Sequence, residues 1–194
     1  MTDARSPTII DGPRDDRRGF LLAGAGLTVA AAAPATAAAA EPTTPRMAEV
    51  VPLVLPRTEF VYEAVVDLEP TVPLGESPLG ERRMVPITGG TFEGPAIRGK
   101  VLPGGADRQL VRKDGVRILN ALYEMQADDG AILTVLNRVL VHEEKDRPRY
   151  AFSTIEVTAP EGPHAWLNRL VLVGTLNSLR PSRAAVLIRA YKVV

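Results

Sequence analysis

Residues 116–141 read VRILNALYEMQADDGAILTVLNRVLV, and this stretch decides the fold class. Apolar and polar side chains alternate through residues 116–126 and again through residues 132–141, which is the period of a β-strand. Asp129-Gly130 lies between the two segments, and Asp-Gly is a strong signal for a tight hairpin turn. The stretch therefore predicts two neighbouring antiparallel strands.

Short alternating segments continue on both sides of this hairpin, separated by glycine, proline and Asp-Gly pairs. The predicted strands are 59–68, 81–87 (before a glycine-rich turn at Thr88-Gly89-Gly90), 96–102, a short strand ending near Val111, 116–126, 132–141, 150–158, 166–176 and 184–193. No window has a sustained helical period, so the predicted class is all-β. Closing eight or nine strands into an antiparallel β-barrel removes the reactive edges of an open sheet, and this is the predicted fold. A two-sheet β-sandwich is the alternative.

The first 40 residues carry a second pattern. The run Asp16-Arg17-Arg18-Gly19-Phe20-Leu21-Leu22 resembles the twin-arginine export signal of bacteria, and an uncharged alanine-rich segment follows it. The segment ends in small residues that a signal peptidase accepts, so we expect cleavage within Ala37 to Glu41. A retained N-terminal anchor is the alternative.

The expected organisation is a signal peptide over 1–40, an extended linker with four prolines over 41–57, and a single β-barrel domain over 58–194. The resemblance implies the twin-arginine export machinery and signal peptidase as partners, and a periplasmic or secreted location. We expect no stable membrane span after processing.

Composition excludes several kinds of site. The chain has 23 basic and 23 acidic residues, which argues against a nucleic acid or an anionic membrane as partner. It has no cysteine, so disulfides, thiol nucleophiles and cysteine-ligated metals are ruled out. Its two histidines, His142 and His164, are too few for a three-histidine metal site and are expected to be exposed, although a mixed histidine–carboxylate site remains open. We expect no metal and no cofactor.

Four segments carry a family resemblance. Residues 83–95, RMVPITGGTFEGP, resemble the most characteristic segment of domain of unknown function family 3237, also called uncharacterised protein family 0311. Matching segments follow in the expected order: LPGGAD at 102–107, DDGA at 128–131 and AWLNR at 165–169. The resemblance implies a compact β-barrel and carries no settled activity. Arg108 stands where that family usually has tryptophan, a change that alters a pocket wall or merely exposes a strand end.

Two carboxylates and a phenol are the catalytic candidates. Glu93 and Asp107 adjoin glycine-rich turns, where we expect the barrel rim, and one of two such carboxyls would gain a raised pKa by partial burial. Tyr123 is the third candidate. The alternative is that each carboxylate accepts hydrogen bonds from turn N–H groups, as such residues often do.

Polar side chains on apolar strand faces are the ligand-binding candidates. Tyr123 alternates onto the face of Leu119 and Met125, and Asn137 lies on the otherwise apolar face of 132–141. An amide on such a face must find partners or face a wet cavity. Trp166 and Asn168 share a face of the predicted strand 166–176. An ordinary barrel core with a few satisfied polar groups would show the same pattern.

The leading functional hypothesis is a barrel in the periplasm that binds a small apolar or aromatic molecule. The alternative is a cofactor-independent isomerase, cyclase, lyase or hydratase that uses carboxylates at the barrel mouth. A third hypothesis is a homo-oligomer that associates through apolar outer faces such as that of residues 166–173. Whether the protein is an enzyme, and which molecule it accepts, the sequence leaves open.

Overall fold

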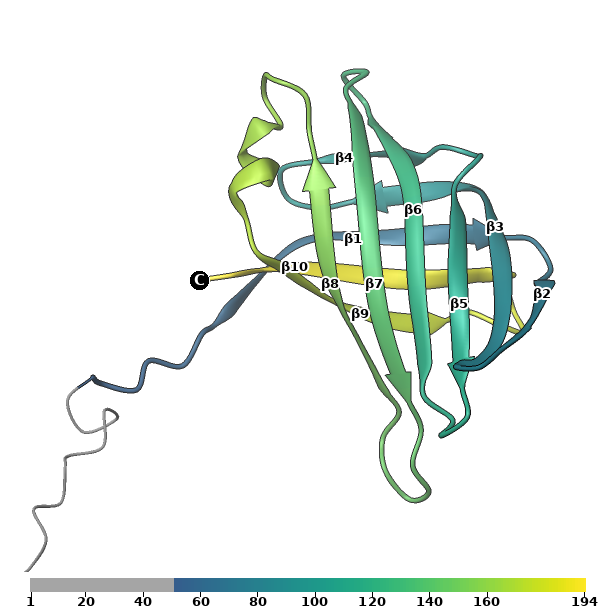
Figure 1. Ribbon diagram of the computed structural model, residues 1–194. Coiled ribbons are helices and arrows are strands. Elements are labelled where there is room, and N and C mark those ends of the chain that lie inside the picture. The colour runs from purple at the N-terminus through teal and green to yellow at the C-terminus, as the bar shows by residue number, and fades with distance from the viewer. Residues whose placement is uncertain (1–50) are drawn as a thin grey trace, which may run out of the picture. The chain divides into compact units, whose positions relative to one another are not determined.

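The computed structural model describes residues 51–194 (Figure 1). The expected export signal, with Arg17 and Arg18, the cleavage segment and most of the expected linker lie outside the described residues. The elements are β1 (Thr58–Leu68), β2 (Val72–Ser77), β3 (Gly80–Glu93), β4 (Arg98–Val101), β5 (Ala106–Arg112), β6 (Arg117–Ala127), β7 (Ile132–His142), β8 (Tyr150–Thr158), the 3-10 helix η1 (Ala165–Arg169), β9 (Leu172–Ser178) and β10 (Ala185–Val193). Over residues 51–194, no helix has the length and apolar character needed to cross a bilayer.

All ten strands belong to one antiparallel sheet that closes on itself. The order runs β1-β10-β9-β8-β7-β6, then β4 and β5 share the next place, and β3 returns to pair with β1. The ring thus has eight places, and β2 pairs with β3 outside it. The predicted closed antiparallel barrel is confirmed. The β-sandwich alternative is wrong, because the β1–β3 pairing joins edges that a sandwich leaves apart.

Strand β3 turns the corner of the barrel. Its first half pairs with β5, and its second half pairs with β1 and β4 (Figure 1). The expected turn at Thr88-Gly89-Gly90 is therefore wrong, because these residues lie inside the strand. Gly90 has a φ of 137°, and a Cβ there would collide with the carbonyl oxygen of Val65 on β1. Glycine is what lets the two strands approach at the point of closure.

The hairpin predicted from residues 116–141 is confirmed, as β6 and β7 pair in continuous register from Arg117–Val141 to Gln126–Ile132. Two details differ from the sequence expectation. Strand β2 was not expected. The expected strand over 166–176 is wrong in its first part, because residues 165–169 form η1 and the strand begins only at Leu172.

Strand β1 contains a β-bulge between Phe60 and Tyr62. The bulge shifts the alternation by one residue, so that Val61 and Tyr62 are both buried while Phe60 is 41% exposed. Simple alternation along residues 59–68 predicts that Phe60 shares a face with Tyr62, and the bulge makes that prediction wrong. The exposed Phe60 ring packs edge-to-face on Tyr191 of β10.

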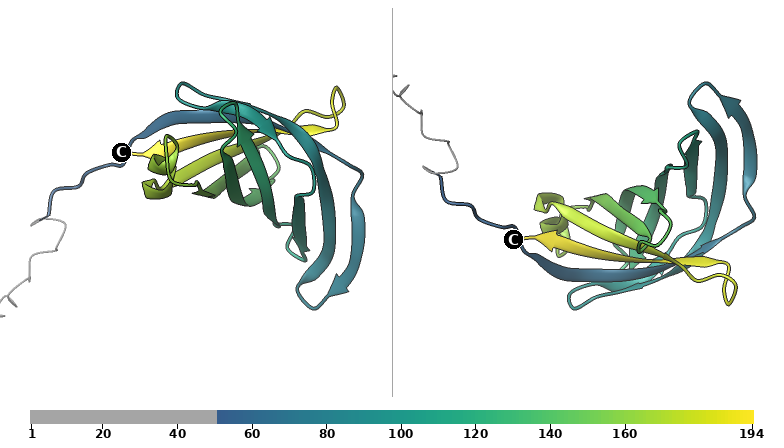
Figure 2. Two further views of the ribbon diagram at one scale, coloured as in Figure 1. Left: turned by 90° about the horizontal axis from the view of Figure 1, so that it is seen from above. Right: turned by 90° about the horizontal axis from the view of Figure 1, so that it is seen from below.

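The barrel interior is packed at one end. Tyr62, Phe92, Met125 and Leu133 are almost completely buried there, and Tyr62 and Phe92 stack edge-to-face. Near the middle of β6 the inward residue is the small Ala121. Figure 2 shows this barrel domain from above and below. An interior cavity lies beside Ala121.

Candidate functional site

A small cavity of about 50 Å³ lies inside the barrel, between the packed end and the opposite mouth. Apolar side chains dominate its wall, and four polar residues interrupt them. The lining residues are Val66, Leu68, Ile87, Asp107, Gln109, Leu119, Ala121, Tyr123, Asn137, Val139, Leu176, Val186 and Ile188. This volume holds a few water-sized groups.

The polar residues are brought together by strand register. Ala121 on β6 lies directly opposite Asp107 on β5 and opposite Asn137 on β7. The two backbones that carry Asp107 and Asn137 are therefore two strand spacings apart, roughly 10 Å. The methyl group of Ala121 between them leaves the space that the cavity occupies. Tyr123 follows two residues along β6 on the same inward face.

Asp107 is a buried carboxyl with a perturbed pKa. Its side chain is 8% exposed, and burial raises its pKa from 3.8 to about 6. Two hydrogen bonds oppose this rise: Gln109 Nε2 donates to Asp107 Oδ2 at 2.6 Å, and the backbone of Asn120 donates as well. A carboxyl with such a pKa exchanges its proton close to neutral pH, which suits general acid–base work.

Several buried polar atoms have no hydrogen-bond partner within residues 51–194. They include Oδ1 of Asp107, both side-chain heteroatoms of Asn137, Oγ of Ser153, and the hydroxyls of Tyr62 and Tyr123. Buried polar groups in native proteins are nearly always hydrogen-bonded, since an unmet one costs about 1–3 kcal/mol. Of these residues, Asp107, Tyr123 and Asn137 line the cavity, so their unused donors and acceptors are the ones that a ligand there could meet.

Outside the cavity, at the barrel mouth, lies a wider vestibule of about 380 Å³. It shares Leu68, Gln109, Leu119, Leu176 and Val186 with the cavity wall, so the two spaces adjoin. Its polar lining consists mainly of arginines, at positions 83, 117, 149 and 180. The cavity and the vestibule together approach the size of small-molecule sites.

The structure gathers three of the six candidate residues and separates Glu93, Trp166 and Asn168 from them. Asp107, Tyr123 and Asn137 line the cavity. Glu93 is exposed at the far end of β3, about 26 Å of extended strand beyond Val85, which is the register partner of Asp107. The expected Glu93–Asp107 pair at the mouth does not form. The turn at Gly104 and Gly105 ends before β5 begins, so Asp107 lies within the strand and not in the turn. Its side chain is buried and points inward.

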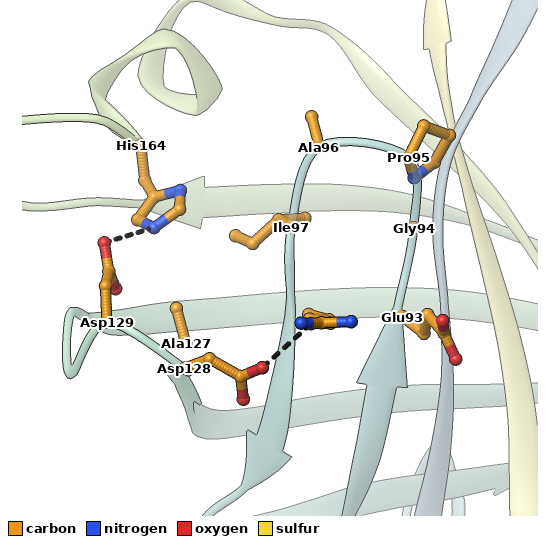
Figure 3. A pocket seen from close by; sticks show the side chains of 10 residues that line it. Glu93, Gly94, Pro95, Ala96, Ile97, Ala127, Asp128, Asp129 and His164 are labelled. Carbon is orange, nitrogen blue, oxygen red and sulfur yellow. Dashed lines mark hydrogen bonds and ion pairs between the residues drawn. The ribbon is translucent and has the colours of Figure 1, made fainter.

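Glu93 borders a different hollow, at the other end of β6 (Figure 3). His164 Nε2 lies 2.9 Å from Asp129 Oδ2 there, and Arg98 Nε donates to Asp128 Oδ2 at 2.9 Å. The His164 side chain is only 11% exposed, so its expected exposure is wrong. Arg98 thus pairs with Asp128 in this hollow, and the His164 ring contacts Asp129. The described part of the chain contains no group of three His, Cys, Asp or Glu side chains placed to bind a metal ion.

Trp166 and Asn168 lie on η1, away from the cavity. Asn168 Oδ1 accepts a hydrogen bond from Ala159 N, while its Nδ2 donates to the carbonyl oxygens of Ala159 and Ala165. These bonds use the amide fully and fix the turn after β8. Trp166 borders a shallow surface hollow beside Phe60. Neither side chain reaches the residues around Asp107.

Arg108 points outward. It is exposed and lies opposite Asn120 on β6 and Met84 on β3, whereas its neighbour Asp107 points inward. Arginine at this position therefore leaves the wall of the interior cavity unchanged. It borders a separate surface hollow together with Met84 and Pro103.

Three buried or cavity-lining polar residues are absent from the predicted site: Tyr62, Gln109 and Ser153. The sequence does carry a signal for Ser153, because it interrupts the buried face Ala151, Ile155 and Val157 of β8 just as Asn137 interrupts β7. The burial of the Tyr62 hydroxyl has no separate signal in the alternation of its strand. Nothing in the sequence singles out Gln109, because its part in the site is the hydrogen bond that it donates to the inward-pointing Asp107.

The fold and the site define a class: a closed antiparallel β-barrel whose mainly apolar interior cavity carries four polar residues and adjoins an arginine-lined mouth. Residues 56–193 match the family described as "Protein of unknown function (DUF3237)". The chain belongs to this family, as its motifs predicted.

Relatives agree with this assignment. A UPF0311 protein of Clostridium acetobutylicum is 30% identical over 149 residues, covering 70% of this chain and 92% of that protein. A UPF0311 protein of Rhodopseudomonas palustris (strain TIE-1) is 40% identical over 80 residues, which cover 41% of this chain and about half (52%) of that protein.

Solved structures share the barrel. A conserved protein of unknown function from Rhodopseudomonas palustris is similar with a TM-score of 0.68 and 27% identity, covering 73% of this chain and 100% of that one. A beta-barrel like protein from Acinetobacter baumannii AYE has a TM-score of 0.66 and 31% identity, covering 73% and 98%. An enzyme from Penicillium herquei shares the fold at 21% identity, with a TM-score of 0.60 and 74% and 98% of the two chains covered.

Proposed function

We propose that this protein is an exported small-molecule-binding β-barrel. Its ligand enters through the vestibule and ends against Asp107, Tyr123 and Asn137. The observation that carries the proposal is the set of buried polar atoms without protein partners around one cavity. The surrounding wall is apolar, so the part of the ligand that enters is small and mainly apolar or aromatic, with a few hydrogen-bonding groups.

Filling the cavity tests the binding proposal. In Ala121→Leu the larger side chain would occupy the space between Asp107 and Asn137, so ligands that stabilise the wild type are expected to lose that effect. The measurement is a thermal-shift screen against a metabolite library, together with mass spectrometry of molecules that co-purify. Asn120→Leu is the matched control, because it adds the same side chain at the neighbouring exposed position.

Circular dichroism of both variants establishes that the barrel forms. Ala121→Leu is expected to cost about 1–3 kcal/mol through overpacking. Ligands that bind Ala121→Leu and the wild type equally well would contradict the proposal.

The second candidate is a cofactor-independent enzyme that moves a proton, such as an isomerase, cyclase, lyase or hydratase. The specific observation in its favour is the buried Asp107 carboxyl, whose pKa of about 6 lies near neutral pH. Tyr123 and Asn137 could orient a carbonyl or hydroxyl beside it, since their polar atoms are unengaged by other described residues. Glu93 has no place in this candidate mechanism, because it lies at the other end of the barrel.

Export is proposed from the N-terminal segment alone. The support is the pair Arg17-Arg18 ahead of an uncharged segment that ends in small residues. Changing both arginines to lysine in the full chain is expected to hold the protein in the cytoplasm of a bacterium with the twin-arginine system, as shown by cell fractionation. Arg14→Lys is the control, since it keeps the charge and lies outside the motif. Unimpaired export of the double variant would refute this part of the proposal.

A further inference from the structure

The vestibule is a strongly positive concave surface, with four arginines in its lining. Its four arginines come from β3, from the start of β6, from the residue before β8, and from the connection between β9 and β10. Among the described residues, no aspartate or glutamate belongs to its lining. The whole chain has no net charge, so this local excess of positive charge is a feature of the site and not of the composition.

Two of the arginines are partly neutralised. Arg117 and Arg149 both donate to Oε1 of Glu143, and Arg149 also donates through Nη1 to the carbonyl oxygen of Leu176 at 2.9 Å. One carboxylate thus serves two guanidinium groups. These contacts hold the two side chains at the mouth and leave positive charge uncompensated.

Arg83 is different, because it has no ion-pair partner among residues 51–194. Its Nε–H is buried and donates to no acceptor among the described residues. Arg83 lies opposite Gln109 in the β3–β5 register, and Gln109 Nε2 donates a hydrogen bond to Asp107. Arg83 is therefore two residues along β3 from Val85, the register partner of Asp107, and it lines the vestibule. Arg180, on the exposed connection between β9 and β10, adds a fourth guanidinium from the other side.

We propose that the vestibule selects organic carboxylates, with the carboxylate held by Arg83 and Arg180 and the apolar body directed past Leu119 and Leu176 toward the cavity. This inference rests on the proposed function and names its ligand class. A guanidinium matches a planar carboxylate with two parallel hydrogen bonds, and a confined positive site attracts anions from solution. The shared chemistry of carboxylates, phosphates and sulfonates is the oxyanion, so a sulfonate dye reports on the site and competition then separates a carboxylate from phosphate.

Two dyes with the same body provide the test. 8-Anilinonaphthalene-1-sulfonate carries an anion, and N-phenyl-1-naphthylamine lacks it; both fluoresce more strongly in an apolar site. Fluorescence titration of the wild type is expected to show about tenfold tighter binding of the anionic dye, because hydrogen bonds to a charged group are stronger than those to a neutral one. Added salt should reduce that preference.

Two variants locate the anion. Arg83→Gln and Arg180→Gln are each expected to weaken the anionic dye severalfold to tenfold and to leave the neutral dye unchanged. Arg138→Gln is the matched control, since Arg138 is exposed on the outer face of β7 and pairs with Glu156. Because Arg180 lies outside the strands, its variant keeps the test valid if Arg83→Gln fails to fold.

The outcomes separate the two proposals. If neither dye binds, both the proposed function and this inference fail. If both dyes bind equally and the arginine variants change nothing, the binding function stands and this inference is overturned. A preference that survives both arginine variants would place the anion elsewhere and would also overturn it.

Competition then identifies the oxyanion. Cinnamate is expected to displace the anionic dye from the wild type, whereas cinnamamide and inorganic phosphate should not. Displacement by phosphate in preference to cinnamate would overturn the carboxylate assignment.

Discussion

Asp107→Asn is expected to stabilise the protein at pH 7.5 by about 2–3 kcal/mol. Burial raises the pKa of Asp107 from 3.8 to about 6, and each pKa unit corresponds to 1.36 kcal/mol of free-energy difference between folded and unfolded states. The folded state therefore disfavours the carboxylate that the unfolded chain carries freely. Asparagine has nearly the same shape and keeps the oxygen that accepts the hydrogen bond from Gln109.

The direction of the pH dependence follows from the raised pKa. About one pH unit below 3.8 and lower, the carboxyl is protonated in both states, and Asp107 costs the fold nothing through its charge. As the pH rises through 3.8 toward about 6, the unfolded chain releases its proton first, so the wild type loses stability over this window. Well above about pH 6 the loss is complete and constant. The advantage of Asp107→Asn should therefore fall to about 0.5 kcal/mol at pH 4.

Urea unfolding at pH 4.0 and pH 7.5 measures this difference. Asp128→Asn is the control, because Asp128 is an exposed carboxylate paired with Arg98 and such pairs contribute at most about 1 kcal/mol. An Asp107→Asn variant that is less stable than the wild type at pH 7.5 would show that the carboxylate is satisfied in the folded protein. A buried carboxyl that lowers the stability of the fold is typical of functional sites, where a perturbed pKa is needed for binding or catalysis.

Gly90→Ala is expected to destabilise the barrel by roughly 4 kcal/mol or more, enough to prevent folding of a marginally stable domain. The added methyl group would collide with the carbonyl oxygen of Val65, and the φ of 137° is itself unfavourable for alanine. The β1–β3 ladder would have to separate at this point, and that ladder closes the ring. Thermal unfolding followed by circular dichroism measures the effect.

Gly89→Ala is the matched control. Gly89 has a similar φ of 146°, but a Cβ there would have only ordinary contact, with the Val101 carbonyl oxygen at 3.6 Å. Its cost should be that of the backbone conformation alone, about 1–3 kcal/mol. Equal losses in the two variants would mean that close approach of β1 and β3 is not what requires glycine at position 90.

Local patterns predicted most of the fold, and the exceptions have physical causes. The β6–β7 hairpin follows from alternation and one Asp-Gly turn, and Asn137 follows from the same alternation because a regular strand fixes the face of every residue. The bulge at Phe60 and the corner in β3 do not follow, because each depends on a partner strand distant in sequence. Residues 165–169 read as a strand, since a single 3-10 turn is too short to show a helical period.

Only the part of the candidate site that lies on regular neighbouring strands could be predicted from the sequence. Tyr123 and Asn137 lie on adjacent regular strands, so pattern and register agree. Glu93 and Asp107 were paired because both adjoin glycines, but glycine in this barrel serves the corner of β3 in one case and the β4–β5 connection in the other. The arginine vestibule could not be foreseen, because its four side chains come from segments that only the closed ring brings together.

The unequal packing of the two barrel ends has a consequence for divergence within the family. At the densely packed end, Met125 and Leu133 fill the barrel interior, where most substitutions leave a void or cause a clash. At the mouth, Arg149 and Arg180 lie beyond strand ends, where replacement leaves the backbone ladder intact. Sequence drift should therefore accumulate around the opening and spare the opposite half. Members of one scaffold could in this way come to accept unlike molecules without rebuilding the barrel.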